Sequence, residues 1–90
     1  MKTNTTEGKI LKDYRQYLKL EKALSANTIE AYLNDLSKLV RFLKDNEIPL
    51  LEAQLEHLES FSASLHDIGI HPRSQARILS GIRSFYHFLV

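Results

Sequence analysis

The residues with the clearest chemical potential lie in the C-terminal stretch, residues 68–90. This stretch contains Arg73, Arg77 and Arg83 and no aspartate or glutamate, whereas residues 1–67 carry nine basic and eleven acidic side chains. Guanidinium groups donate hydrogen bonds in a planar fork that fits phosphate oxygens and the acceptors on base edges. The pattern indicates a surface for a polyanion, although three arginines alone are equally compatible with a solvated helix face.

Catalytic chemistry has little support in the sequence. The tyrosines all fall on or beside stripes of apolar residues, where they are predicted to pack rather than to act as nucleophiles: Tyr14, Tyr17, Tyr32 and Tyr86. The four histidines form no pair at the i, i+4 spacing of a helical zinc site. Glu52, Glu56 and Glu59 are predicted to form one solvated helix face, and no glycine-rich phosphate loop is present. We expect no catalytic residue, no metal site and no cofactor in this chain.

Hydrophobic periodicity predicts four helices and no strand, an all-α fold. The first helix is expected over residues 9–20, and the second begins after Ser25, a natural N-cap. Asn46 and Pro49 end the second helix, and the third runs up to a C-terminal cap at Gly69. The fourth begins at about Pro72, because the first residue of a helix tolerates proline.

Composition indicates one small domain with a single core. The 90 residues are 43% hydrophobic and 26% charged, and they include no cysteine. No apolar run approaches the roughly 20 residues that span a bilayer, and the N-terminus lacks the apolar region of a signal peptide. We expect a cytoplasmic protein without membrane contact, in which residues 1–8 are a flexible tail and residues 9–90 form one domain.

The fourth helix divides into an apolar side and a polar side when its residues are projected around the helix axis. The apolar side is predicted to be buried and holds Ile78, Leu79, Ile82, Phe85, Tyr86 and Leu89. The polar side and its margins hold Arg73, Ser74, Arg77, Ser80, Gly81, Arg83, Ser84 and His87. The small residues Ser80, Gly81 and Ser84 would let the backbone approach a groove or another helix closely.

The second helix has a more mixed exposed face. It holds Asn27, Ala31, Asn34, Lys38 and Arg41, and it is flanked by Glu30, Asp35 and Asp45. Most exposed helix faces mix charges in this way, so this face alone is also typical of plain solvent-facing surface.

Two blocks of sequence carry a family resemblance, "LSANTIEAYLNDLSKLVRFL" and "GIHPRSQARILSGIRSFYHFL". The telling residues of the first block are Ser25, Asn27, Thr28, Tyr32, Asp35 and Leu36. Those of the second are Pro72, Arg73, Ser74, Arg77, Leu79, Ser80, Ile82, Arg83, Phe85, Tyr86, Phe88 and Leu89. In this order and spacing, the blocks resemble the N-terminal core-binding, SAM-like domain of tyrosine recombinases, the Xer recombinase and phage integrase group. The resemblance covers roughly residues 8–90.

The resemblance implies a small four-helix orthogonal bundle that forms half of a clamp around double-stranded DNA at a recombination site. It implies that the tyrosine nucleophile lies in a separate catalytic domain, which we expect to follow Val90 and to be absent from this chain. It also implies DNA contacts from the second and fourth helices, at Asn27, Thr28, Ala31, Asn34, Lys38, Arg73, Ser74, Arg77, Ser80 and Gly81. The projections add Arg41 and Ser84 to this predicted DNA-binding set.

The expected roles follow from side-chain chemistry. Arg73 and Arg77 would anchor the domain on phosphates or guanine edges, Lys38 and Arg41 would add charge, and the amide and hydroxyl side chains would position it by hydrogen bonds. Two positions depart from the family pattern. His71 stands where a helix-capping residue is usual, so the cap is weaker or His71 contacts phosphate when protonated. Gln54 likewise replaces the usual cap of the third helix.

A helical protein–protein interaction module is the alternative function. In proteins that the chain resembles, the first helix contacts neighbouring recombinase protomers on DNA, and Leu20, Leu24 or the side of Tyr14 and Tyr17 could form such an interface here. These residues could equally complete the core. We expect the isolated domain to be monomeric and to bind DNA weakly.

Overall fold

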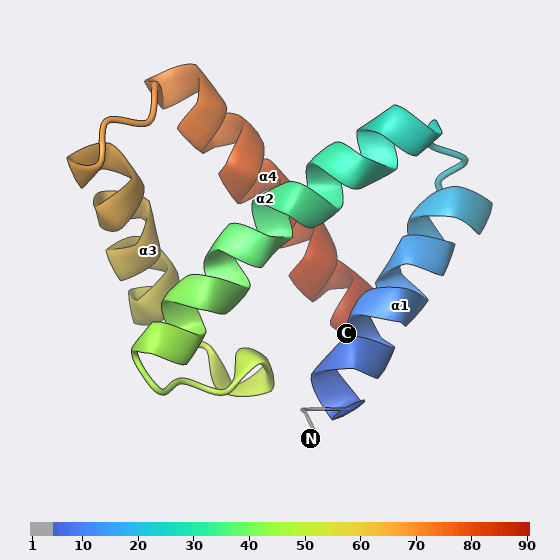
Figure 1. Ribbon diagram of the computed structural model, residues 1–90, viewed down its shortest axis with the longest axis horizontal. Coiled ribbons are helices and arrows are strands. Elements are labelled where there is room, and N and C mark those ends of the chain that lie inside the picture. Colours follow the sequence, from blue (N-terminus) through green and yellow to red (C-terminus); the bar gives the residue numbers. More distant parts are fainter. Residues whose placement is uncertain (1–4) are drawn as a thin grey trace. The chain divides into compact units, whose positions relative to one another are not determined.

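The structure is a computed structural model that describes residues 5–90, with side chains from Gly8 onward. Over these residues the chain forms four α-helices and one short 3-10 helix (Figure 1). The elements are α1 (Thr5–Leu20), α2 (Ala26–Asp45), η1 (Leu50–Glu52), α3 (Leu55–Asp67) and α4 (Pro72–Leu89). No strand occurs in this part of the chain, and the predicted all-α class with four helices is confirmed.

The predicted helix ends are mostly correct because local signals set them. Ser25 caps α2: its Oγ accepts a hydrogen bond from the backbone N–H of Thr28 at 3.2 Å. Gly69 follows α3 with a φ of 87°, in the left-handed region where glycine has no Cβ penalty. The N–H of Gly69 donates to the carbonyl of His66, and that of Ile70 donates to the carbonyl of Leu65. These two bonds form a Schellman cap.

The N-terminal boundary differs from the prediction. Helix α1 begins at Thr5, four residues before the expected start, so residues 5–8 of the predicted flexible tail are helical. The remaining tail residues, 1–4, lie outside the described residues. The sequence also gave no indication of η1, which occupies the connection between α2 and α3 directly after Pro49.

The described residues fall into two compact units, Met1–Asn34 and Asp35–Val90, and the boundary lies within α2. In the first unit the buried apolar side chains are Tyr14, Leu18 and Ile29, and Arg15 pairs with Glu30 at 2.7 Å. In the second unit the buried apolar side chains are Leu36, Leu39, Leu43, Leu50, Phe61, Leu65, Ile78, Ile82 and Phe85.

Side chains from every element of the second unit meet in its core. The rings of Phe42 in α2 and Phe61 in α3 are 5.4 Å apart between centroids, and α3 also lies against α4. The apolar side predicted for α4 is buried at Ile78, Ile82 and Phe85, and half-buried at its remaining positions. None of the described helices is both long and apolar enough to cross a membrane.

Tyr86 joins α4 to η1 by a hydrogen bond. Its hydroxyl donates to the backbone carbonyl of Leu50 at 2.9 Å, and burial raises the pKa of Tyr86 from 10.0 to about 12. Because the folded pKa lies above the unfolded value, the folded state holds this proton more tightly. The corresponding stability is present below pH 10 and is lost as the pH rises through about 12.

Replacing Tyr86 by Phe tests this contact. We expect Tyr86→Phe to lower the free energy of unfolding by about 1 kcal/mol at neutral pH, because the Leu50 carbonyl loses its donor. The variant should also lose less stability than the wild type between pH 10 and 12. Urea denaturation measures both effects. The control, Tyr32→Phe, should change stability by less than about 0.5 kcal/mol; equal effects of the two substitutions would contradict a structural role of the Tyr86 hydroxyl.

Candidate nucleic-acid interface

His71 fixes the start of α4 and with it the position of Arg73. The Nδ1 atom of His71 accepts a hydrogen bond from the backbone N–H of Arg73 at 3.0 Å, and Pro72 occupies the first helical position. An imidazole nitrogen can accept a hydrogen bond only when it carries no proton. His71 thus forms a helix cap at this position, while a weaker cap and a phosphate contact of protonated His71 stay predictions.

A second histidine stabilises the start of α3 in a related way. The backbone N–H of Gln54 donates to Nδ1 of His57 at 2.8 Å, so the side chain at the third helical position reaches back to the residue before the helix. Gln54 itself donates through Nε2 to the carbonyl of Glu52 at 3.4 Å. The side chain of His57 thus satisfies the backbone N–H of Gln54 at the start of α3.

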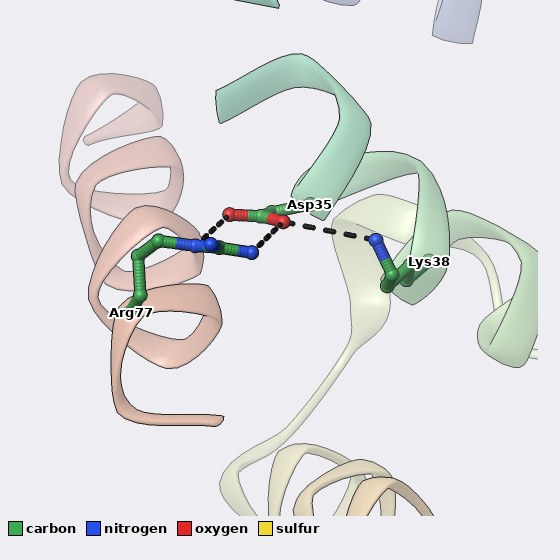
Figure 2. Close-up of polar contacts among 3 residues, drawn as sticks. All are labelled: Asp35, Lys38 and Arg77. Atoms are coloured by element: carbon green, nitrogen blue, oxygen red, sulfur yellow. Dashed lines mark hydrogen bonds and ion pairs between the residues drawn. The ribbon is translucent and has the colours of Figure 1, made fainter. Parts of the chain in front are cut away.

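Asp35 and Arg77 form the central polar contact of the second unit (Figure 2). The Nε and Nη2 atoms of Arg77 donate to Oδ2 and Oδ1 of Asp35, both at 3.1 Å. The Nζ atom of Lys38 lies 3.7 Å from the same Oδ1. The prediction that Asp35 flanks an exposed face is wrong: the residue is only 3% exposed. The carboxylate is directed toward α4 and links that helix to α2.

Burial makes this contact energetically important. A carboxylate that loses its water must be compensated by hydrogen bonds or by an opposite charge. Arg77 supplies both through two parallel N–H groups, the strongest arrangement available to a carboxylate. Among the described residues, no buried side-chain nitrogen or oxygen lacks a hydrogen-bond partner. The Asp35–Arg77 pair thus satisfies a group that would otherwise destabilise the fold.

The other arginines of this unit are not neutralised in the same way. Arg41, Arg73 and Arg83 are exposed, and their guanidinium groups form no ion pair with any of residues 8–90. Ser80 is exposed on α4, while Ser74 and Ser84 are half-buried. The exposed side of α4 therefore presents positive charge and hydroxyl groups, as the helical projection predicts.

Gly81 is placed differently from its prediction. It was expected at the margin of the polar face, where it would let the backbone approach a groove or another helix, and the structure buries it. A Cβ added at this glycine would meet no atom within 4 Å outside its own helix. Its burial leaves little of its backbone at the surface, so it is the weakest member of the predicted set.

Four of the residues predicted to contact DNA lie in the first unit. Asn27, Ala31 and Asn34 are exposed on α2, and Thr28 is half-buried. Thr28 already serves the helix start, because its Oγ1 accepts a hydrogen bond from Ser25 Oγ at 3.0 Å. Asn27, Ala31 and Asn34 thus have the exposure that a DNA contact requires, and the half-buried Thr28 side chain serves the helix start.

A groove lies between α3 and α4 in the second unit. Its volume is about 590 Å³, and its lining residues are Leu55, Leu58, Glu59, Ser62, Leu79, Ile82, Arg83, Tyr86, His87 and Val90. The surface of the lining is mostly apolar, although five of the ten lining residues have polar side chains. In the described part of the chain, no three His, Cys, Asp or Glu residues come together as metal ligands.

One signal for the buried carboxylate was present in the sequence. Asp35 lies next to Leu36 and four residues before Leu39, and both leucines belong to the buried stripe of α2. Residues at i and i+4 share a helix face, so Asp35 belongs to the edge of that stripe. The identity of its partner had no such signal, because Arg77 is 42 residues away in sequence.

Loss of Arg77 should destabilise the fold more than loss of a neighbouring arginine. We expect Arg77→Met to lower the free energy of unfolding by about 1–3 kcal/mol, because Asp35 keeps a buried charge without its main partner. Adding Asp35→Asn should recover part of this loss, since the buried charge is then removed. The matched control, Arg73→Met, should change stability by less than about 0.5 kcal/mol.

Urea denaturation of the wild type, Arg77→Met, Asp35→Asn and the double variant completes a double-mutant cycle, and Arg73→Met is measured beside them. An Arg77→Met variant as stable as Arg73→Met would show that the ion pair contributes nothing to folding.

Comparison with known proteins gives the family of the chain. The family described as "Phage integrase, N-terminal SAM-like domain" matches residues 11–90. Tyrosine recombinase XerD of Chlorobaculum tepidum is 39% identical over 82 residues, which are 91% of this chain and 27% of that protein. Tyrosine recombinase XerC of Pseudomonas savastanoi pv. phaseolicola is 39% identical over 77 residues, or 84% of this chain and 26% of that protein. No solved structure matches the chain.

The chain spans about a quarter of the length of the curated relatives it matches. The match begins at residue 11 and includes both sequence blocks on which the predicted resemblance depends. It also includes the Asp35–Arg77 pair and all exposed arginines of the second unit. The predicted resemblance is confirmed, and the chain belongs to the phage integrase N-terminal SAM-like domain family.

Proposed function

We propose that this chain binds double-stranded DNA as the N-terminal clamp domain of a site-specific tyrosine recombinase. The observation that carries the proposal is the exposed side of α4, where unpaired arginines face solvent and no acidic side chain occurs anywhere in residues 68–90. DNA presents a dense row of phosphate charges, and neutralising them with arginine or lysine supplies most sequence-independent affinity. Membership in the family and the names of the relatives support the same function.

The start of α4 is suited to a phosphate for a second reason. Backbone N–H groups at a helix N-terminus point out of the helix and carry partial positive charge. The first turn of α4 contains no acidic residue, and Arg73 is the second residue of the helix. A phosphate at this end would meet the guanidinium of Arg73 and the helix dipole together, while Arg41 on α2 adds a further unpaired charge.

We assign no step of strand cleavage to this chain. Two of the four tyrosines are poor nucleophiles: Tyr14 is fully buried, and the Tyr86 hydroxyl donates a hydrogen bond to the Leu50 carbonyl and has a raised pKa. The curated relatives are recombinases about three times as long as the chain. In the proposed function this domain holds the recombination site, and DNA cleavage and rejoining belong to the remainder of a longer protein.

The salt dependence of binding tests the proposal. With about four to six phosphate contacts, a plot of log K against log salt concentration should have a slope of roughly −4 to −5. We expect Arg41→Ala and Arg73→Ala together to make this slope shallower by about 2, because each contact contributes about 1. Fluorescence anisotropy with a labelled duplex measures the slope.

Lys12→Ala supplies a matched control. Lys12 is an exposed cation on α1, so its loss changes the net charge without touching α4. It should leave the slope nearly unchanged. The proposal fails if the wild-type chain does not bind duplex DNA at low salt, or if Lys12→Ala weakens binding as much as Arg73→Ala.

Assembly with other recombinase protomers is the second candidate function. Leu20, in the last turn of α1, is 71% exposed, so its side chain is accessible to a partner. Tyr14 is fully buried and cannot contribute to one, and Leu24 and Tyr17 are half-buried. Chemical shifts that change on α1 rather than on α4 when a duplex is added would favour this candidate.

A further inference from the structure

The Asp35–Arg77 pair determines which part of the Arg77 guanidinium is available to a ligand. A guanidinium has five N–H groups, one on Nε and two on each Nη atom. Asp35 accepts from Nε and from Nη2, so three N–H groups remain, two on Nη1 and one on Nη2. The Arg77 side chain keeps 59% of its surface exposed. Its end-on edge, formed by Nη1 and Nη2, can therefore still donate two parallel hydrogen bonds.

The carboxylate beside Arg77 makes this edge less favourable to a phosphate than the edge of an unpaired arginine. Asp35 offsets part of the charge of Arg77, while Nζ of Lys38 lies 3.7 Å from the same carboxylate, so the three groups together carry a net charge of +1. A phosphate that approached Arg77 would also be repelled by Asp35. The O6 and N7 atoms of guanine carry no net charge, and they accept two hydrogen bonds from a correctly oriented guanidinium fork. The carboxylate of Asp35 supplies this orientation, because it accepts from Nε and Nη2 of Arg77.

The unpaired arginines have the opposite properties. Arg41 and Arg73 keep their full charge, but no partner in residues 8–90 fixes the orientation of their guanidinium groups. A freely rotating cation suits phosphate oxygens, which attract charge from many directions. The paired Arg77 is thus suited to a base edge, and the unpaired Arg41 and Arg73 are suited to phosphates.

We propose that Arg77 reads a guanine in the major groove through its Nη1–Nη2 edge, with Asp35 as the positioning residue that holds the fork. The inference rests on the proposed DNA-binding function and goes beyond it, because it separates the residue that reads sequence from the arginines that supply affinity. Arg77 contacts the base, and Asp35 acts only through Arg77.

The test starts by selecting preferred duplexes from a randomised pool with the wild-type chain. Each guanine of the selected sequence is then replaced, one at a time, by 7-deazaguanine, which lacks the N7 acceptor but keeps base pairing. We expect one replacement to weaken wild-type binding about tenfold. The Arg77→Lys variant keeps the charge and loses the fork, so it should be insensitive to that replacement while its salt slope stays that of the wild type.

Two further variants separate positioning from charge and from folding. Asp35→Asn removes a negative charge, so we expect tighter binding to random duplex together with a several-fold loss of preference for the selected sequence. A purely structural role of Asp35 would instead weaken binding to every duplex. Arg73→Lys is the matched control, because it should keep the wild-type sequence preference. Circular dichroism confirms that each variant is folded before binding is compared.

The outcomes distinguish this inference from the proposed function. If Arg77→Lys responds to 7-deazaguanine as the wild type does, Arg77 does not read a guanine and the inference is overturned while DNA binding stands. A wild-type chain that binds duplexes without any preference overturns it in the same way. A wild-type chain that binds no duplex at low salt overturns the proposed function and the inference together.

Discussion

A buried carboxylate that must keep its charge compensated is the constraint around which the second unit is organised. Asp35 is almost fully withdrawn from water, and its two oxygens accept from the side-on edge of Arg77. This contact joins the middle of α2 to the first half of α4, which places the exposed residues of α4 at a fixed rotation about the helix axis. The buried Ile78 and Ile82 hold the same rotation from the apolar side.

The same contact divides the positive charges into two classes. Arg77 is oriented by its pairing with Asp35, whereas Arg41 and Arg73 form no ion pair with any of residues 8–90. Affinity for a polyanion depends mainly on unneutralised charge, while recognition of a base depends on the geometry of donors. One small unit can therefore carry both properties, because a single acidic residue is placed beside only one of its arginines.

Local signals made most of the fold predictable from the sequence. Ser25, Gly69 and Pro72 define helix ends by their own backbone and side-chain chemistry, and the structure places each of them as predicted. Features that depend on distant partners were not predictable. Asp35 was predicted only to flank an exposed face, because its partner Arg77 is 42 residues away in the sequence. The hydrogen bond that His71 Nδ1 accepts from the backbone N–H of Arg73 was likewise not predicted.

For the candidate DNA-binding surface as well, local features were predictable from the sequence and features that depend on distant partners were not. Helical projection separates the exposed from the buried residues of α4 correctly at Arg73, Arg77 and Ser80. It places Gly81 at a margin of the polar face, whereas the structure buries this residue. A projection also cannot show that one of three exposed arginines is held by a carboxylate, which is the feature that distinguishes their proposed roles.

The most direct test of this account is an NMR spectrum of the arginine Nε–H groups of the 15N-labelled chain as a duplex is added. The account predicts that the Arg77 Nε–H signal stays protected from exchange and nearly unshifted, because Asp35 still accepts from it, while the Arg73 signal moves with the added DNA. Loss of protection at Arg77 on binding, or an unchanged Arg73 signal at saturating duplex, would contradict it.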